Sequence, residues 1–254
     1  MNRKRILAVI AGRYYPEYNG QAKIFHESAS RINRSKQAQI EVIRFRYDGK
    51  KIKNYIQDGI SVKTINLPIQ PKGIGLLLGL VITGIYFYFH FRKIHKEFEI
   101  VHGITVTWTT IICLNIAKLF SKKTILESSA LGDVISPIGN IPKFIYDLKE
   151  YFKYFLIKRI DKVKVYSKAQ LSEIEKIDYK NKVYKIQPSI DTDNHRPVSI
   201  YEKNKLRKKY NINEDTKVIS FVGNVCFRKG FDLLLEAFFI LRKKNLDTLL
   251  FAAG

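Results

Sequence analysis

The chain has 254 residues, of which 46% are hydrophobic and 27% are charged, so a sizeable core is expected and global disorder is not indicated. Lysine and arginine number 45 against 23 acidic residues, and the net charge of +22 attracts polyanions such as lipid head groups, sugar phosphates or nucleic acid. The sequence has no zinc-ligand spacing and no recognisable nucleic-acid module, so no nucleic-acid partner is expected. Only two cysteines, Cys113 and Cys226, are present, which disfavours a disulfide framework and suits a cytoplasmic location.

Short apolar runs alternate with longer amphipathic segments along the first 186 residues. The run at 5–11 predicts a buried strand rather than a signal peptide, because it is short and leads straight into a polar turn. This alternation predicts a mainly parallel sheet covered on both faces, that is, an α/β, Rossmann-like domain over 1–186. In chain order we expect strands at 5–11, 40–45, 61–67, 99–102, 123–126, 162–166 and 182–186, with helices at 21–33, 74–96, 107–119, 142–159 and 168–177.

The uncharged segment 73–89 has three possible placements. It is seventeen residues long, near the lower limit for a membrane-spanning helix. A core helix is favoured, insertion into a membrane surface comes second, and a true span comes last because it would disrupt the sheet. The aromatic cluster beside Arg92 and Lys93 resembles an interfacial anchor. Peripheral attachment to an anionic inner face of the plasma membrane therefore stays open.

A second domain is predicted after a linker at 187–199, which contains Pro188, Pro197 and several turn-forming residues. The alternation then restarts with a helix at 201–210, a strand at 218–222, a helix at 230–243 and a strand at 248–253. We expect 200–254 to be the incomplete start of a second Rossmann-like domain, because two strands cannot bury both faces of a parallel sheet.

Two strand-to-helix turns are candidate anion sites. Asn19-Gly20 is a strong turn pair directly before a helix, whose first backbone N–H groups can bind an anion. Such turns are also common without any ligand. Further along, Arg228 and Lys229 precede a helix beginning near Gly230, where a nucleotide diphosphate could sit. For two cations by themselves, a solvated basic loop is the alternative.

The stretch Gly223–Phe238, with Lys229-Gly230 followed by Asp-Leu-Leu-Leu-Glu-Ala-Phe, closely resembles the start of the C-terminal domain in retaining GT-B glycosyltransferases of family 4. Three shorter segments, at 15–20, 99–102 and 188–191, are similar to other motifs of that family. The resemblance implies GT-B architecture. It also implies transfer of a sugar, with retention, from a nucleotide-sugar donor to a glycan or lipid-linked acceptor, in cell-surface polysaccharide assembly and with neither cofactor nor metal.

On the donor side, the resemblance assigns Lys229 to the lysine that contacts the donor diphosphate. Gly20 matches the second glycine of a loop that approaches the phosphates or the acceptor. Gly223 ends the first strand of the second domain. Asn224 stands where the family usually has an arginine, and Arg228 is the candidate to compensate for it.

For the transferred sugar, the segment after Leu126 resembles branches of the family that use Glu followed by Gly-Asp, which makes Glu127 the candidate catalytic residue. A loop carboxylate is an equally weighted alternative. Tyr15, Asn19 and His102 are the acceptor-side candidates, although His102 fits a structural role at a strand end better.

The family's paired glutamates, which hold the donor sugar and ribose, would fall beyond Gly254. The competing hypothesis is therefore a truncated or split-gene fragment that binds acceptor, membrane or a partner fragment without turnover.

Overall fold

The computed structural model describes residues 3–17, 20–49, 53–71, 75–135, 142–179, 183–188, 192, 196–244 and 246–253. The chain divides into two compact units, Met1–Ile190 and Asp191–Gly254. Of the predicted linker at 187–199, residues 189–191 and 193–195 lie outside the described residues.

The first unit is built on an eight-stranded sheet with the order β3-β4-β2-β1-β5-β6-β7-β8. All neighbouring strands run parallel except the β3–β4 pair. The strands are β1 (Lys4–Ala11), β2 (Ala38–Arg46), β3 (Tyr55–Gln57), β4 (Ile60–Asn66), β5 (Ile100–Ile104), β6 (Lys123–Glu127), β7 (Lys162–Val165) and β8 (Val183–Lys185). The helices are α1 (Gly20–Arg34), α2 (Leu76–Ile94), α3 (Trp108–Leu119), α4 (Lys143–Lys158) and α5 (Lys168–Glu175).

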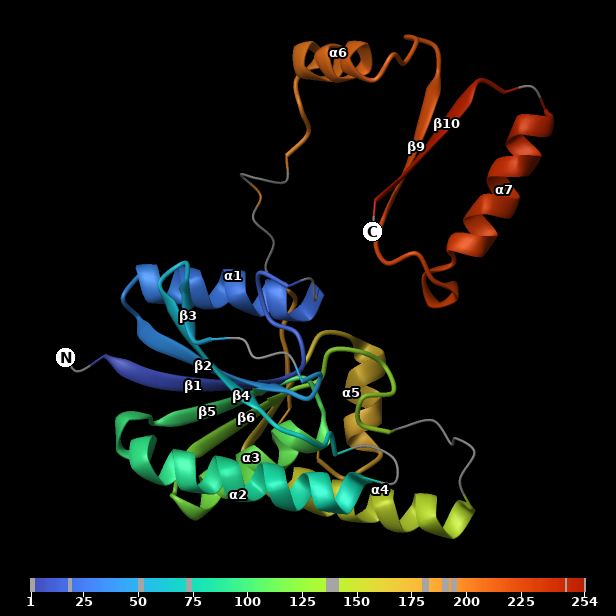
Figure 1. Ribbon diagram of the computed structural model, residues 1–254. Coiled ribbons are helices and arrows are strands. Elements are labelled where there is room, and N and C mark those ends of the chain that lie inside the picture. Colours follow the sequence, from blue (N-terminus) through green and yellow to red (C-terminus); the bar gives the residue numbers. More distant parts are fainter. Residues whose placement is uncertain are drawn as a thin grey trace. The chain divides into compact units, whose positions relative to one another are not determined.

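The direction of each crossover decides which face a helix covers. The β1–β2 connection moves one way along the sheet, whereas the connections from β4 to β8 move the other way. Right-handed crossovers then place α1 on one face and the remaining helices on the opposite face. Figure 1 shows α1 on one side of the sheet and α2, α3 and α4 on the other. Two buried apolar clusters fill the two layers.

The predicted strands and helices of this unit are confirmed to within a few residues at their ends, and β3 was missed. This strand forms a hairpin with β4 through Asp58 and Gly59, whose φ angles are 49° and 77°. Asp-Gly is a strong signal for such a turn, because both residues tolerate positive φ. The signal was present in the sequence, but three residues are too few to show an alternating pattern.

Helix α2 agrees with the prediction of a core helix on one side only. Phe87 and Phe91 are fully buried and stacked, and Phe87 also packs against Phe45 of β2. A 3-10 turn, His95–Glu97, follows the helix. The other side of α2 exposes apolar residues, so the helix is not covered on most sides as expected. By length and hydropathy alone, Leu76–Glu97 could also cross a membrane.

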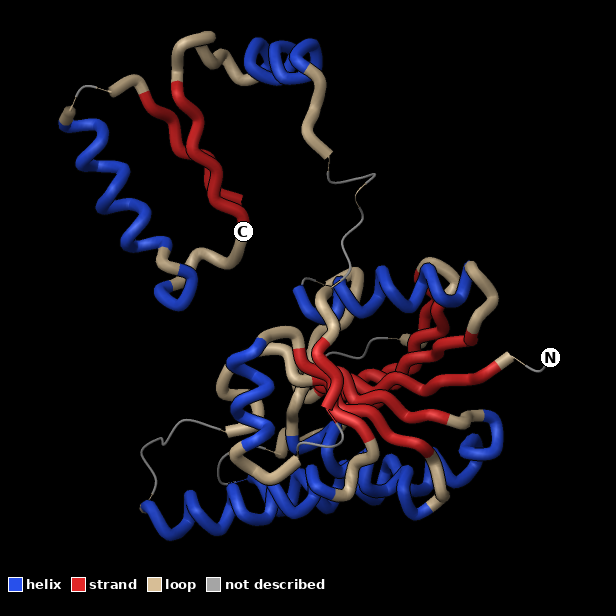
Figure 2. The backbone as a smooth tube through the Cα atoms, turned by 180° about the vertical axis from the view of Figure 1, so that it is seen from behind, coloured by secondary structure: helices blue, strands red, loops and turns tan. Residues whose placement is uncertain are grey.

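The second unit contains a single parallel β–α–β arrangement, seen with strands in red in Figure 2. Its elements are α6 (Ile200–Lys209), β9 (Lys217–Val222), the 3-10 turn Phe227–Lys229, α7 (Phe231–Lys243) and β10 (Thr248–Ala253). Ser199 begins α6 with a capping box, since its hydroxyl accepts from Glu202 N while the Glu202 carboxylate accepts from Ser199 N. The predicted α/β, Rossmann-like fold class is confirmed.

Candidate active site

The candidate site in the first unit lies at the carboxyl edge of the sheet, beside the point where strand order reverses. From β1 the sheet grows through β2 on one side and through β5 on the other. In doubly wound sheets, ligands bind outside the carboxyl ends of the strands at such a switch point. The residues at the carboxyl ends of β1, β5, β6 and β7 are therefore the candidate site residues.

Glu127, the last residue of β6, is the centre of a polar cluster at this edge. Its side chain is 0% exposed. Gln21 Nε2 and Lys164 Nζ each donate to its carboxylate at 3.1 Å, and the Tyr166 hydroxyl donates as well. His102 Nε2 lies 3.3 Å from Glu127 Oε2 without hydrogen-bond geometry, so that contact is electrostatic. Residues from α1, β5, β6 and β7 thus meet at one carboxylate.

The surroundings keep Glu127 ionised. Burial alone would raise the pKa of this carboxyl, but His102, the charge of Lys164 and the Tyr166 hydroxyl together hold the pKa well below its usual range. Burial, followed by the negative charge of Glu127, raises the pKa of Tyr166. Glu127 is therefore a buried anion. It would affect a bound ligand by positioning and polarising the side chains that surround it, not by direct contact. Its predicted catalytic role stays a prediction.

The loop after β6 is fixed by Asp133. One carboxylate oxygen of Asp133 accepts from Ser129 N, Ser129 Oγ and Ala130 N at 2.8 to 2.9 Å. Gly132 has a φ of 84° and donates its N–H to Glu173. The Gly-Asp pair that follows Glu127 in the sequence therefore shapes the loop.

Two further residues at this edge were not singled out from the sequence. Thr105 follows β5 with a φ of 76°, which is strained for a β-branched residue. Ile104 pairs with Glu127, so Thr105 and Ser128 continue two neighbouring strands. The hydroxyls of both residues are buried without a hydrogen-bond partner. A strained backbone beside unsatisfied hydroxyls is typical of ligand sites. The sequence could not indicate Thr105, because a backbone φ angle has no signature in a single sequence.

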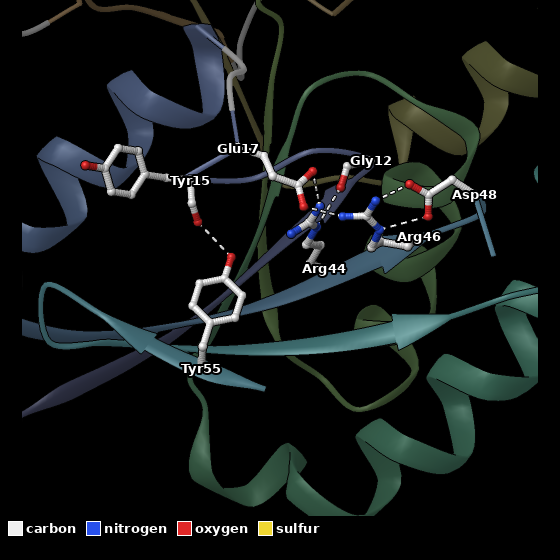
Figure 3. A network of polar contacts seen from close by, with 7 residues as sticks. All are labelled: Gly12, Tyr15, Glu17, Arg44, Arg46, Asp48 and Tyr55. Carbon is white, nitrogen blue, oxygen red and sulfur yellow. Dashed lines mark hydrogen bonds and ion pairs between the residues drawn. The ribbon is translucent and has the colours of Figure 1, made fainter. Parts of the chain in front are cut away.

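A buried arginine holds the loop between β1 and α1. Arg44 of β2 is 1% exposed. Its Nε donates to the Gly12 carbonyl at 2.9 Å, and its guanidinium lies 2.7 Å from the Glu17 carboxylate (Figure 3). Tyr55 of β3 donates its hydroxyl to the carbonyl of Tyr15 at 2.7 Å. Side chains from β2 and β3 thus hold the residues that follow β1.

Arg46 extends this network at the end of β2. It contacts both Glu17 and Asp48, as Figure 3 shows. Burial would raise the pKa of Glu17, but Arg44 and Arg46 together lower it. A pocket of about 200 Å³ lies beside the network, lined by Gly12, Arg13, Arg46, Tyr47, Asp48 and Gln70.

The predicted acceptor-side residue Tyr15 stacks on His26 of α1, with 4.6 Å between the ring centroids. His26 itself lies between Tyr14 and Asp58, with 3.0 Å from Tyr14 Oη to Nδ1 and 2.9 Å from Nε2 to Asp58 Oδ2. The hydrogen bond from His26 lowers the pKa of Asp58. This network ties the loop to the β3–β4 turn. Asn19, also predicted on the acceptor side, lies outside the described residues.

Gly20 is the first residue of α1, as the predicted anion turn requires. A Cβ placed on it would meet no described atom within 4 Å. Gln21, the next residue, reaches the Glu127 cluster. The helix N-terminus and the cluster therefore belong to one site in the first unit.

In the second unit, the predicted diphosphate residues lie on the loop between β9 and α7. Gly223 closes β9 and donates its N–H to Ala253 O at 2.8 Å. Asn224 and Lys229 are exposed on the loop. Gly230 adopts a φ of 68° and caps α7, which places Lys229 directly before the helix N-terminus. The side chain of Arg228 is not among the described parts of the chain.

Among the described residues, no group of three or more His, Cys, Asp or Glu side chains could hold a metal ion. Lys164 on β7 in the first unit, and Lys229 on the loop after β9 in the second unit, are cations that could each neutralise an anion bound in its own unit.

Comparison with known proteins gives one family and a common fold. Residues 202–254 match the family described as glycosyl transferases group 1. No curated protein matches the sequence. Among solved structures, a glycosyltransferase from Rickettsia africae is 14% identical with a TM-score of 0.63, over 100% of this chain and 69% of that one. Sucrose-phosphate synthase from Thermosynechococcus elongatus is 15% identical with a TM-score of 0.70, over 99% and 71%. HepE from Anabaena, in complex with UDP and glucose, is 12% identical with a TM-score of 0.63, over 98% and 61%.

At these identities the structural likenesses establish the fold: the chain has the α/β, Rossmann-like arrangement found in GT-B glycosyltransferases. The family match covers only the second unit, and it contains Gly223, Asn224 and Lys229.

Proposed function

We propose that this chain belongs to a glycosyltransferase that moves a sugar from a nucleotide-sugar donor to a glycan or lipid-linked acceptor, with retention at the anomeric carbon. The observation that carries the proposal is the match of residues 202–254 to glycosyl transferases group 1 on the unit that presents Lys229 before α7. Two similar structures were solved with UDP or a UDP-sugar analogue, which supports a nucleotide-sugar as the donor.

The role of the second unit would be to stabilise negative charge electrostatically. When the bond between sugar and diphosphate breaks, negative charge develops on the departing diphosphate. A lysine and the N-terminus of a helix both favour that charge, because the helix end carries about half a positive unit. Lys229 and α7 provide this pair, and Asn224 adds a neutral hydrogen-bonding side chain on the same loop.

The first unit would present the acceptor and stabilise the transferred sugar. Lys164 is the partly exposed cation of the Glu127 cluster, and Gln21 links that cluster to the N-terminal turn of α1. We place the reaction in the cytoplasm and in cell-surface polysaccharide assembly. Support for a reducing compartment comes from the two free cysteines, of which Cys113 is fully buried.

The proposal is tested by incubating the protein with a panel of nucleotide-sugars and following the release of nucleoside diphosphate, with and without glycan or lipid acceptors. The anomeric coupling constant in the NMR spectrum of the product decides whether configuration is retained. We expect one donor to be consumed, and Lys229→Ala to slow the release by roughly tenfold or more. Lys217→Ala, at the opposite end of β9, is the control. Binding of a donor without any turnover would favour the non-catalytic hypothesis.

A further inference from the structure

Helix α2 is apolar on both of its sides, one buried against the sheet and the other exposed. One side packs on the sheet through Phe87 and Phe91. The other side is exposed, with Leu77 at 77%. The exposed apolar residues of α2 are Leu77, Leu78, Val81, Ile85, Tyr86 and Phe89. A soluble surface helix normally carries polar residues on its outer side, so this outer side calls for a partner.

Helix α4 departs from the usual amphipathic pattern. Its inner side buries Leu156 and Ile157 but also an ion pair between Glu150 and Lys153, with 2.8 Å between Oε2 and Nζ. Its outer side exposes Phe144 at 72%, Leu148 at 67% and Tyr151 at 71%. These residues are four and three positions apart, so they form one stripe along the helix. Burying charges while exposing aromatic side chains is costly in water.

The two stripes join into one surface. A groove of about 570 Å³ runs between α2, α3 and α4, and it is lined mainly by aliphatic and aromatic side chains. Its lining includes Leu77, Val81 and Ile85 from α2, Ile116 from α3 and Phe152 from α4. Figure 1 shows α2 and α4 on the same side of the sheet. We call the exposed apolar residues of α2 and α4, with this groove, the α2–α4 face.

Cations border the α2–α4 face. Lys143 begins α4, while Lys158 and Arg159 lie at its end, and all three are exposed. Arg92 and Lys93 are exposed at the end of α2. The one exposed carboxylate of α4 is that of Asp147. A surface of apolar and aromatic side chains bordered by lysine and arginine is typical of proteins that bind the interface of an anionic bilayer. The apolar side chains enter the head-group region, and the lysines and arginines contact lipid phosphates.

Charge also argues against a second copy of the chain as the occupant. Two copies meeting through this face would bring the same cations together, and the net charge of +22 would add to their repulsion. A membrane span is excluded as well, because Phe87 and Phe91 of α2 are fully buried in the core.

We propose that the α2–α4 face is a membrane-binding surface that inserts into the head-group region of an anionic bilayer. This inference uses only residues of the first unit and does not depend on the proposed reaction. It would hold the Glu127 site close to a membrane, where an acceptor with a lipid portion is found.

The first test is sedimentation with phosphatidylcholine vesicles, with and without phosphatidylglycerol. The protein is expected to pellet with the anionic vesicles and to bind less as salt is raised. Phe144→Ser, Leu148→Ser and Tyr151→Ser combined should weaken binding by at least roughly tenfold. These side chains are exposed, so the melting temperature should stay unchanged. Ile56→Ser on β3, where Ile56 is 76% exposed, is the matched control and should bind like the wild type.

A second variant tests the cations. Lys143→Glu with Lys158→Glu should weaken binding to the anionic vesicles by roughly fivefold or more for each residue, because each lysine near the surface contributes such a factor. Binding to pure phosphatidylcholine should stay at its lower level. If both sets of variants pellet like the wild type, the proposal is wrong.

A third measurement locates the contact. Trp108 is the only tryptophan, so Leu148→Trp in a Trp108→Phe background places a single reporter on the α2–α4 face. A blue shift of its emission with anionic vesicles supports insertion. Pelleting without that shift, or a wild-type dimer that the serine variants convert to a monomer without any vesicle binding, would assign the face to another use and overturn the proposal.

Discussion

Gln21 Nε2 donates a hydrogen bond of 3.1 Å to the carboxylate of Glu127. Gln21 lies in the first turn of α1 and Glu127 ends β6, so this bond joins two elements separated by more than a hundred positions in the sequence. It links the N-terminal turn of α1 to the buried polar cluster at the carboxyl edge. Side chains from four elements of the first unit thus meet in this cluster.

The first prediction concerns the free energy of unfolding. Glu127→Gln removes the anion that faces Lys164, and leaves the positive charge of this lysine without its partner. We expect a loss of about 3 kcal/mol, measured by urea unfolding. Glu41→Gln, which breaks the more exposed pair with Arg5, should cost about 1 kcal/mol or less. Equal losses in the two variants would contradict the account of the cluster.

The second prediction concerns acid stability. The pKa of Glu127 is lowered in the folded state, so its contribution is present above the unfolded pKa and is lost as pH falls toward the folded pKa. Below about pH 5 the wild type should therefore lose stability faster than Glu127→Gln, and the gap between them should narrow. Unfolding curves at several pH values check this. A gap that stays constant down to about pH 3 would show that Glu127 is not stabilised as an anion.

The third prediction concerns the loop between β1 and α1. Arg44→Ala removes the donor to the Gly12 carbonyl and one of the two arginines on Glu17. We expect about 3 kcal/mol of destabilisation, together with faster amide hydrogen exchange over residues 12–17. Lys23→Ala removes only a surface contact of 3.9 Å with Glu27 and should change stability by less than about 0.5 kcal/mol. Unchanged exchange in Arg44→Ala would refute the anchoring role.

The fourth prediction compares two glycines. Gly230 has a φ of 68°, so Gly230→Ala should destabilise the second unit by about 1 kcal/mol through backbone strain, although no atom lies within 4 Å of the new Cβ. Gly20 begins a helix, and a Cβ placed on it would meet no described atom within 4 Å. Gly20→Ala should therefore preserve the melting temperature. If Gly20 approaches a bound phosphate or acceptor, the same variant should weaken ligand binding, which a titration of the folded protein measures.

Much of the fold could be predicted because strands and helices each leave a local pattern of apolar residues in the sequence, with a period of two for strands and of about 3.6 for helices. The run at 5–11 forms the predicted strand, and the segment 74–96 forms the predicted helix, although only one side of that helix is buried. The hairpin strand β3 was not predicted, because its three residues are too few to show an alternation of apolar and polar side chains. Contacts between distant positions were not predictable either: the sequence indicated Glu127 but gave no sign that Gln21, Lys164 and Tyr166 enclose it. The strain at Thr105 has no signature in a single sequence.

The most direct measurement of the central claim is calorimetric titration of the protein with a panel of nucleoside diphosphates. We predict saturable binding of one of them, weakened by roughly tenfold or more in Lys229→Ala and unchanged in Lys217→Ala. Absence of binding to every member of the panel, or equal binding by the two variants and the wild type, would contradict the assignment of the β9–α7 loop as a diphosphate site.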